Sequence, residues 1–390
     1  MTAGETCHLC GGAACTVAAD GRDGLDDALG GVTSDCRPWS GPVALAVCEV
    51  CGTVQKVIDA DWRSQCREIY ASYRVYRQGA GSEPAVFGAG GMGAARSLAL
   101  LERLLGTLAL PEDGRLLDLG CGDGTLLRHA ARLRPGWRLT GTDLGDQYRP
   151  AIEAIPGLER FHTGPLAALP GGYDLATALH VLEHIEDPAG FLGSLRPLLA
   201  GHGRLAVEVP DIDANPFDLL VIDHATHFSS ASLSWLLRSA GFSVEACRSD
   251  WIARELSAIA AAGANARDAD SPLREVPERS RRLVAGHRRW LRRLRDQAAA
   301  LAQSRGVALF GTSIAASWLA GVLGSGRIRF FVDEDPARAG STYLGRPVLS
   351  PADVAAGETV CMPMTPVTAA AIAARIAGPR YALVLPPPLP

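Results

Sequence analysis

The stretch Arg115-Leu-Leu-Asp-Leu-Gly-Cys-Gly-Asp-Gly-Thr125 decides the fold of the central part of this chain. Leu116–Leu119 is a short apolar run that predicts a buried strand, and Leu126–Leu133 predicts the helix that follows it. The glycines between them permit a tight turn at which a ligand can approach the backbone closely. A second predicted strand, Arg138–Thr142, ends in Asp143, whose carboxylate can accept hydrogen bonds from both hydroxyls of a ribose. The pattern is typical of a nucleotide-type α/β sheet.

The turn itself, Asp118-Leu-Gly-Cys-Gly-Asp-Gly124, has the form DxGxGxG and resembles the first motif of class I S-adenosylmethionine (SAM) methyltransferases. SAM carries a sulfonium and an amino acid instead of a phosphate, so an acid beside the turn suits it better than the GxGxxG turn of dinucleotide enzymes. Three later segments resemble the fourth strand, the fifth strand and the closing helix and strand of that superfamily: Tyr173–Pro188, Gly203–Pro210 and Leu233–Ala246. The resemblance implies a Rossmann-like SAM core over about residues 90–250. The alternative is a Rossmann module that does not bind SAM.

The same resemblance implies where the cofactor is bound. Its residues surround the methionine part, the ribose, the adenine and the transferring methyl group, in that order: Asp118, Gly120 and Gly122; Asp143; Leu144; and Leu179, His180 and His184.

Two cysteine pairs lie near the N-terminus, Cys7-His-Leu-Cys10 and Cys48-Glu-Val-Cys51. Each CxxC turn places two thiolates on one side of a tight turn, and two such turns supply four soft ligands in a tetrahedron. We therefore expect a structural Zn²⁺ site that stabilises the fold and does not catalyse. A redox CxxC or unrelated cysteines are the alternative.

The segment Asp223-His-Ala-Thr-His-Phe-Ser229 follows the predicted fifth strand, where substrates meet SAM in this superfamily. His224 and His227, with the neighbouring carboxylate of Asp223, are suited to general-base chemistry near neutral pH. The alternative is that a histidine at this position only orients the loop.

The whole order of motifs resembles a narrower family, the nucleotide-sugar C-methyltransferases of deoxysugar biosynthesis. The second cysteine pair continues as Cys51-Gly-Thr-Val-Gln55, Tyr70–Arg77 is aromatic, and a second Rossmann-like unit begins at Val307. The resemblance implies that a zinc-binding N-domain and a C-terminal α/β domain clamp a sugar nucleotide, and that a base removes a proton from the carbon next to a 4-keto group. It assigns the base to His224 and the family's glutamate to Asp223. The family's tyrosine falls on Val221, and His227 stands where the family has another tyrosine.

The composition of the chain argues against some classes of function. The chain has 390 residues, 38 basic and 42 acidic, and a net charge of −4, which argues against binding to nucleic acid polymers. No apolar run approaches the length of a membrane span, and the N-terminus has no apolar signal-peptide region. We expect a cytoplasmic protein with a small-molecule substrate and no membrane partner. Lys56 is the only lysine; every other basic residue is arginine.

The predicted organisation has four parts: a zinc-binding module (1–65), a SAM methyltransferase core (66–250), a helical connector (251–305) and a C-terminal Rossmann-like α/β domain (306–390). The predicted function is SAM-dependent C-methylation of a keto nucleotide-sugar through an enolate, in natural-product (antibiotic) biosynthesis. The alternatives are an O- or N-methyltransferase acting on another small intermediate, and a non-catalytic module that binds SAM or zinc.

Overall fold

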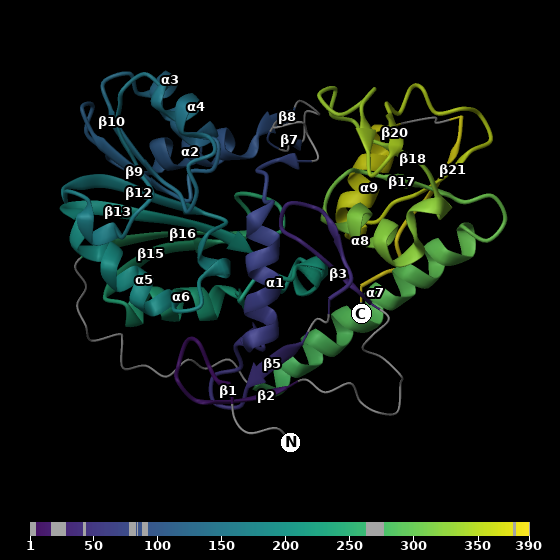
Figure 1. The fold of residues 1–390 in the computed structure, drawn as a ribbon, viewed down its shortest axis with the longest axis horizontal. Coiled ribbons are helices and arrows are strands. Elements are labelled where there is room, and N and C mark those ends of the chain that lie inside the picture. The colour runs from purple at the N-terminus through teal and green to yellow at the C-terminus, as the bar shows by residue number, and fades with distance from the viewer. Residues whose placement is uncertain are drawn as a thin grey trace.

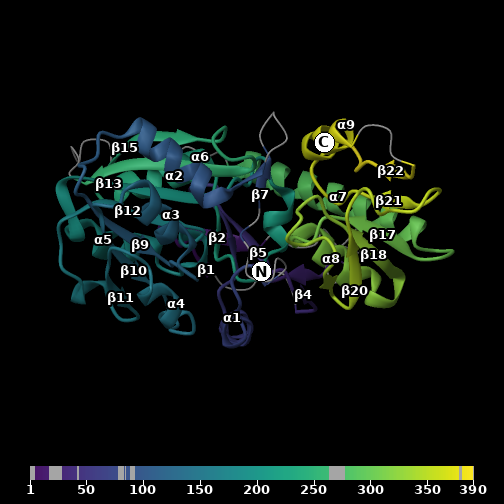
Figure 2. The ribbon, with the colours of Figure 1, turned by 90° about the horizontal axis from the view of Figure 1, so that it is seen from above.

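The structure is a computed structural model that describes residues 5–16, 29–41, 44–77, 83, 85–87, 93–262, 277–376 and 380–389. Two α/β lobes lie side by side, and the N-terminal elements lie between and below them in the view of Figure 1. The view from above in Figure 2 shows the same two lobes separated by the N-terminal segment. Among the described residues, none of the helices combines the length and apolarity needed to cross a membrane.

The first lobe is built on a seven-stranded sheet. Its strands are β9 (Arg115–Leu119), β10 (Arg138–Thr142), β11 (Leu158–His162), β12 (Tyr173–Leu179), β13 (Leu199–Pro210), β15 (Phe242–Arg248) and β16 (Glu255–Ala262). Their spatial order is β11-β10-β9-β12-β13-β16-β15. The first five strands in that order are parallel, and β16 runs antiparallel to both of its neighbours. The predicted strands around the glycine turn are confirmed.

The order of the strands reverses at one point in this sheet. From β9 the chain moves outward through β10 to β11, and then returns to build β12 and β13 on the other side of β9. In open α/β sheets, ligands bind beyond the carboxyl ends of the strands at the point where the order reverses. Here that point lies between β9 and β12.

The predicted helical connector over residues 251–305 is wrong in its first part. Glu255–Ala262 forms β16 and pairs with β13 and β15 inside the sheet. The run LSAIAAA lacks polar alternation because a central strand is buried on both faces, and such a run is hard to distinguish from a buried helix. Residues 263–276 lie outside the described residues. The helical prediction is confirmed for α7 (Pro277–Leu301).

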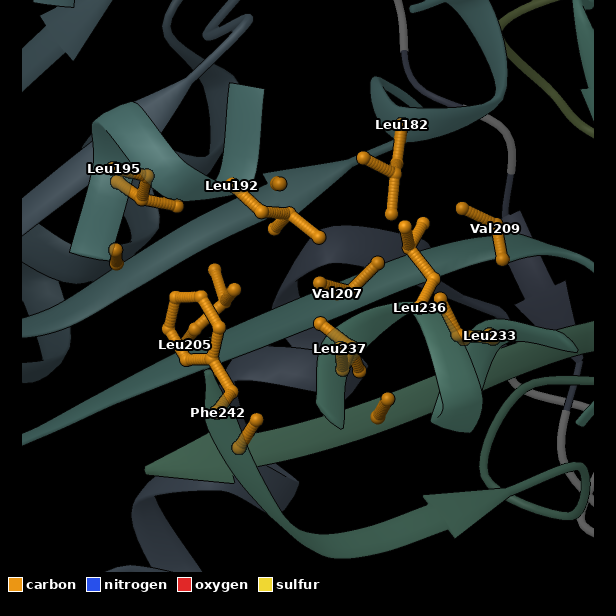
Figure 3. Close-up of a cluster of buried hydrophobic side chains, with 14 of the residues drawn as sticks. Leu182, Leu192, Leu195, Leu205, Val207, Val209, Leu233, Leu236, Leu237 and Phe242 are labelled. Atoms are coloured by element: carbon orange, nitrogen blue, oxygen red, sulfur yellow. The ribbon is translucent and has the colours of Figure 1, made fainter. Parts of the chain in front are cut away.

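Helices cover both faces of the first sheet. On one face lie α5 (Pro188–Leu195) and α6 (Ser230–Ser239), whose leucines pack onto Leu205, Val207 and Val209 of β13 (Figure 3). Residues of α2 (Arg96–Thr107) and α3 (Thr125–Leu133) form a second cluster with other strand residues, and α4 (Arg149–Glu153) follows β10. Leu182 belongs to the cluster of Figure 3 and is fully buried, so it fixes the short 3-10 turn Leu182–His184 that follows β12.

The N-terminal module contributes a small antiparallel sheet that includes a segment of the central domain. Its strands are β1 (Glu5–Thr6), β2 (Ala13–Thr16), β5 (Leu45–Cys48), β6 (Val54–Lys56) and β14 (Thr226–His227), in that order. β14 comes from the predicted base segment and pairs antiparallel with β6. The helix α1 (Ala60–Ala71) follows and stands between the lobes in Figure 1. Two-residue and three-residue strands form the small ribbons β3 (Gly31–Val32) with β4 (Pro38–Trp39) and β7 (Ala85–Phe87) with β8 (Gly93–Ala95).

The C-terminal lobe is a second α/β unit. Its strands are β17 (Val307–Phe310), β18 (Ile328–Val332), β19 (Thr342–Tyr343), β20 (Arg346–Leu349), β21 (Thr359–Cys361) and β22 (Ala382–Val384), with helices α8 (Ile314–Leu323) and α9 (Pro366–Arg375). The sheet order is β19-β20-β18-β17-β21-β22, and only the β19–β20 pair is antiparallel. The two lobes meet where Phe217 lies edge-on to Trp290 of α7 and Trp318 of α8.

Candidate active site

The glycine turn after β9 is shaped for close approach of a ligand to the backbone. Gly120 has φ of +61°, and a Cβ there would lie 2.6 Å from a methyl of Val181. Gly122 has φ of +56°, which also disfavours a side chain. The N–H of Gly122 donates to Oδ2 of Asp143 over 2.8 Å, so the acid that ends β10 is tied to the turn. The structure thus brings Gly120, Gly122 and Asp143 together as predicted.

Asp118 lies on β9 at the base of this turn and is only 3% exposed. Its Oδ1 accepts a 2.7 Å hydrogen bond from the hydroxyl of Thr177 on β12. Burial raises the pKa of Asp118 to about 7, although the bond from Thr177 acts in the opposite direction. A cationic ligand at this carboxylate would favour its ionised form. The ammonium group of a bound amino acid is such a ligand.

The remaining predicted cofactor residues fall into two environments. Leu144 follows Asp143 and is 87% exposed, so its apolar side chain is available to cover a planar ring. Leu179 ends β12, and His180 follows it with φ of +54°, a conformation that favours glycine. His184 lies four residues further on, in the 3-10 turn.

His180 lies in a buried ionic cluster. Its Nδ1 is 3.1 Å from Glu183, and its Nε2 is 3.4 Å from Glu208 and 3.9 Å from Glu255. Nε of Arg96 lies 3.6 Å from Glu208. Burial and Arg96 oppose protonation of His180, but the three glutamates outweigh them and raise its pKa to about 10. His180 is therefore a cation at neutral pH and is poorly suited to act as a base.

The predicted base segment contains a pair of histidines that share one carboxylate. Nδ1 of His224 lies 2.6 Å from Oδ1 of Asp218, and Nδ1 of His227 lies 2.6 Å from Oδ2 of the same residue. All three side chains are buried. Although burial alone would raise the pKa of Asp218, the two imidazoles hold it well below its usual range. An ionised carboxylate can only accept hydrogen bonds, so both imidazoles carry their proton on Nδ1.

This geometry leaves Nε2 of His224 as a proton acceptor. Burial lowers the pKa of His224, but the hydrogen bond and charge of Asp218, with smaller contributions from Glu183 and Asp223, raise it above its ordinary value. An oriented imidazole with a raised pKa is the usual form of a general base.

Asp223 lies beside His224 in sequence, but its carboxylate binds elsewhere. Its two oxygens accept hydrogen bonds from the backbone N–H and the hydroxyl of Ser34, at 2.9 and 2.5 Å. Asp223 therefore fastens the N-terminal module to the base segment, and Asp218 is the carboxylate in contact with His224. The backbone oxygen of Asp223 accepts a 2.7 Å bond from Nδ1 of His184.

His184 and Tyr70 complete the surroundings of the base. The rings of His184 and His224 meet edge to face with centroids 4.7 Å apart, and the Tyr70 hydroxyl lies 3.0 Å from Nδ1 of His184. Ligand atoms of Glu183, His184 and His224 lie within 4.8 Å of one another. Burial raises the pKa of Tyr70 well above its ordinary value, so its hydroxyl stays protonated and can donate to an oxygen. Burial and the neighbouring His224 lower the pKa of His184, which favours its neutral form.

The sequence reasoning did not select two residues of this group, Asp218 and Lys56. Asp218 lies in a short 3-10 turn, Pro216–Leu220, whose residues are all buried. Lys56 ends β6, and its Nζ lies 3.1 Å from Nε2 of His227. A signal for both is present: each is a charged residue inside a run of apolar neighbours, and a buried charge needs partners.

The four predicted metal ligands converge. Sγ of Cys7 lies 3.6 Å from Sγ of Cys51, and Sγ of Cys10 lies 3.6 Å from Sγ of Cys48, with all four sulfurs within 4.8 Å of one another. A tetrahedral Zn²⁺ site with Zn–S bonds of about 2.3 Å requires sulfur separations of about 3.8 Å. Backbone N–H groups also point at the sulfurs, for example that of Gly12 at Cys10 over 3.4 Å. This donor set fits a structural Zn²⁺ ion.

The central domain, which carries the glycine turn, is similar to known proteins. Residues 93–246 match a family described as "Methyltransferase domain". The match spans about two fifths of the chain, and it covers the glycine turn and most strands of the seven-stranded sheet.

Individual relatives share this domain. A protein of transposon Tn4556 from Streptomyces fradiae is 38% identical over 111 residues, which are 26% of this chain and 32% of the relative. The malonyl-[acyl-carrier protein] O-methyltransferase of Magnetococcus marinus is 34% identical over 27% of this chain and 42% of its own length. The ubiquinone biosynthesis O-methyltransferase of Xanthomonas euvesicatoria is 29% identical over 34% of this chain and 63% of its own length. The chain thus spans from about a third to under two thirds of the length of these relatives.

Among solved structures, a TehB-like SAM-dependent methyltransferase from Corynebacterium glutamicum is similar, with 17% identity and a TM-score of 0.35. The match covers 52% of this chain and 96% of that one.

Proposed function

We propose that the protein is a SAM-dependent C-methyltransferase that acts on a keto nucleotide-sugar, with His224 as the general base. The observation that carries this proposal is the pair of Asp218 and His224, which leaves Nε2 of a buried imidazole available to accept a proton. Methylation of carbon needs such a base, because a carbon next to a ketone becomes nucleophilic only after it loses a proton. The five residues from His180 to His184 follow β12, the strand beside the glycine turn, and the ring of His184 contacts that of His224.

SAM, when bound at the glycine turn, supplies an electrophilic methyl group, and Asp118 and Asp143 hold its ammonium group and its ribose. Nε2 of His224 takes a proton from the carbon adjacent to the ketone, and the electron pair of that C–H bond passes to the enolate. The Tyr70 hydroxyl, which lies 3.0 Å from Nδ1 of His184, is placed to donate a hydrogen bond to the enolate oxygen, where charge develops. Bound SAM would supply the methyl group to which the enolate carbon bonds, with S-adenosylhomocysteine as the leaving group, and His224 keeps the proton until solvent removes it. General-base catalysis of this kind accelerates a reaction by about 10²- to 10⁴-fold.

The C-terminal lobe supports a substrate with a nucleotide part. Its sheet also reverses order, between β17 and β21, and the turn after β17 carries Thr312. Arg338 is buried beside this turn, donates to Thr312 over 3.0 Å and lies 3.4 and 3.5 Å from the carboxylates of Asp333 and Asp335, while its Nη2 makes no hydrogen bond. The loop at Cys36 connects this lobe to the base, since the Tyr343 hydroxyl donates to the Cys36 carbonyl while Ser34 binds Asp223. A ligand that extends from one sheet to the other would pass this loop.

We further propose that Cys7, Cys10, Cys48 and Cys51 hold a structural Zn²⁺ ion. All four positions are occupied by thiolates, so the site has no open coordination position for a substrate. Its contribution to activity is indirect, through β6 and its pairing with β14.

O-methylation is the second candidate, because two relatives are named O-methyltransferases. A hydroxyl nucleophile needs only alignment and modest deprotonation, and exchange of a carbon-bound hydrogen is not part of that reaction. Solvent exchange therefore distinguishes the two functions.

The test uses thymidine diphosphate-4-keto-6-deoxyglucose as the probe, in D₂O with S-adenosylhomocysteine in place of SAM. Proton NMR of the hydrogens on carbons next to the ketone should show enzyme-dependent loss of one signal. The rate should fall by about 10²-fold or more in His224→Gln. The matched control is His202→Gln, because His202 is an exposed histidine bonded to Asp174. Equal exchange rates in the His224→Gln variant and the wild type would rule out His224 as the base.

A further inference from the structure

The only lysine in the chain lies at the base segment, not on the surface. Lys56 is 1% exposed and ends β6, the strand that pairs with β14. Its Nζ donates to the backbone oxygen of Leu219 over 2.8 Å and lies 3.1 Å from Nε2 of His227. A fully buried ammonium group is costly in a folded protein unless its donors are used. Because Lys56 is buried, it does not act at the protein surface. Its two hydrogen bonds indicate a specific role inside the fold.

The donors and acceptors that these side chains offer determine on which atoms their protons lie. A lysine side chain has no acceptor when it is charged, and it has two N–H donors left when it is neutral. In both states it can donate to Leu219 and to His227, and a charged Lys56 can only donate, so Nε2 of His227 is then the acceptor. The proton of His227 must then lie on Nδ1, from which it is donated to Asp218.

The position of the proton on His227 also affects His224, the proposed base. Asp218 accepts one N–H from His227 on Oδ2, and Oδ1 faces Nδ1 of His224. A His227 ring with its proton on Nε2 would present a lone pair to Asp218. That repulsion would favour protonation or movement of the carboxylate, and His224 would no longer be held with Nε2 free.

We propose that Lys56 is a positioning residue that reinforces the tautomer selected by Asp218, because its hydrogen bond to Nε2 of His227 keeps the proton of His227 on Nδ1 and so keeps Asp218 in place to hold His224. The N-terminal module would in this way set the state of a base that belongs to the central domain. The inference rests on the proposed function, because the free Nε2 of His224 matters only if His224 accepts the proton.

The hydrogen bonds that lead from Lys56 through His227 and Asp218 to His224 form a relay. The titratable groups around this relay come from several helices, strands and turns. Asp218, Asp223 and Cys66 lie near Lys56, and burial lowers the pKa of Lys56 to about 7 against the opposing charges of the two aspartates. Around His224 lie Asp218, Glu183, Asp223 and His184. Lys56 can make both of its hydrogen bonds in either protonation state, but a neutral amine can also accept a proton from Nε2 of His227, so only the charged lysine excludes the other tautomer.

The first test is spectroscopic and needs no substrate. ¹⁵N NMR of the full-length protein labelled at histidine should show His224 and His227 with protonated Nδ1 and unprotonated Nε2 at pH 8. In Lys56→Met, His227 should become a mixture of tautomers. In Lys56→Gln, whose amide keeps two N–H donors, the wild-type pattern should return at least in part. A His227 ring protonated on Nε2 in the wild-type protein would overturn the proposal, even if Lys56→Met does not fold.

The second test is a double-variant cycle with the D₂O exchange assay and the same sugar nucleotide. Lys56→Met should slow exchange by about tenfold or more and shift the acid limb of its pH profile. In a His227→Phe background, the same change should alter the rate less than about twofold, because the relay is already broken. Equal effects in both backgrounds would mean that Lys56 only stabilises the fold. Failure of the proposed function gives a different result, in which His224→Gln exchanges as fast as the wild type while the tautomers are as expected.

Discussion

Nδ1 of His224 lies 2.6 Å from Oδ1 of Asp218, six residues earlier in the chain. The carboxylate is buried in the short turn Pro216–Leu220, and the imidazole meets the ring of His184 in the turn that follows β12. Two energetic effects follow. The hydrogen bond selects one tautomer of His224, and the negative charge favours the protonated imidazole. Both are properties of a base that must accept a proton and hold it briefly.

Asp218→Asn should slow the deprotonation step by about 10²- to 10⁴-fold, because an amide no longer holds His224 with Nε2 free. Its rate profile should also change with pH. Asp218 raises the pKa of His224, so its neutralisation should move the acid limb of the profile to lower pH. The D₂O exchange rate measured from pH 5 to pH 9 checks both effects. Asp213→Asn is the matched control, since Asp213 is a neighbouring carboxylate bonded to Arg279. A normal rate in Asp218→Asn would contradict the pairing.

The affinity for SAM should depend on pH through Asp118. Burial raises the pKa of Asp118 to about 7, so below pH 7 the free protein has to lose a proton before it can bind an ammonium group. The dissociation constant should therefore rise by up to about tenfold per pH unit below pH 7 and level off above it. Asp118→Asn should bind more weakly and lose this part of the pH dependence. Calorimetric titration of SAM at pH 6, 7 and 8 measures it, with Asp123→Asn as a control from the same turn. An unchanged slope in Asp118→Asn would exclude Asp118 as the titrating group.

Removal of zinc should affect the base as well as stability. Cys48→Ser removes one thiolate from the knuckle that leads into β6, and β6 holds β14 and Lys56. The melting temperature should fall by about 5–10 °C, as expected for a loss of a few kcal/mol in a chain of this size. The exchange rate should fall with it, while SAM affinity changes little. Cys247→Ser, which alters a partly exposed cysteine, is the control. Metal analysis that finds no zinc in the purified wild-type protein would contradict the assignment.

His180 should make the fold sensitive to alkaline pH. Its three glutamate neighbours raise its pKa to about 10, against burial and Arg96, from an ordinary value of about 6.5. The resulting stabilisation is fully present below about pH 6.5 and is lost as pH rises toward 10, with a slope of up to about 1.4 kcal/mol per pH unit. His180→Asn keeps a residue that tolerates the positive φ but removes the charge. The difference in melting temperature between the variant and the wild type should shrink from pH 7 to pH 10. A constant difference would mean that His180 is not charged in the folded protein.

The central fold was predictable because its signal is local. Arg115–Thr125 contains strand, turn and helix in one stretch, and β10 ends at Asp143 as the pattern indicates. Ala-rich β16 was misinterpreted as helical because its burial on both faces removes the alternation that marks a strand. The division of the chain into four units remains a prediction, and β14 shows why sequence alone sets it poorly. Two residues from the central domain complete the sheet of the N-terminal module.

The site could be predicted only where its residues share a motif. His224 and His227 were selected because they lie together in the sequence, and Asp223 was chosen as their partner for the same reason. The geometry instead pairs both histidines with Asp218, because Asp223 is held by Ser34 from a segment nearly two hundred residues away. Lys56 reaches His227 across a similar separation. Such contacts arise from tertiary packing, and one sequence carries no record of them beyond the presence of a charge in an apolar run.

The central claim is that the enzyme forms a carbon–carbon bond, and the position of the transferred methyl group tests it most directly. The protein is incubated with SAM labelled with ¹³C in its methyl group and with thymidine diphosphate-4-keto-6-deoxyglucose, and the product is examined by ¹³C NMR. The account predicts a labelled methyl signal coupled to the carbon next to the ketone, and no such product from His224→Gln. A label bonded to oxygen would contradict the claim, as would the same product in undiminished yield from His224→Gln.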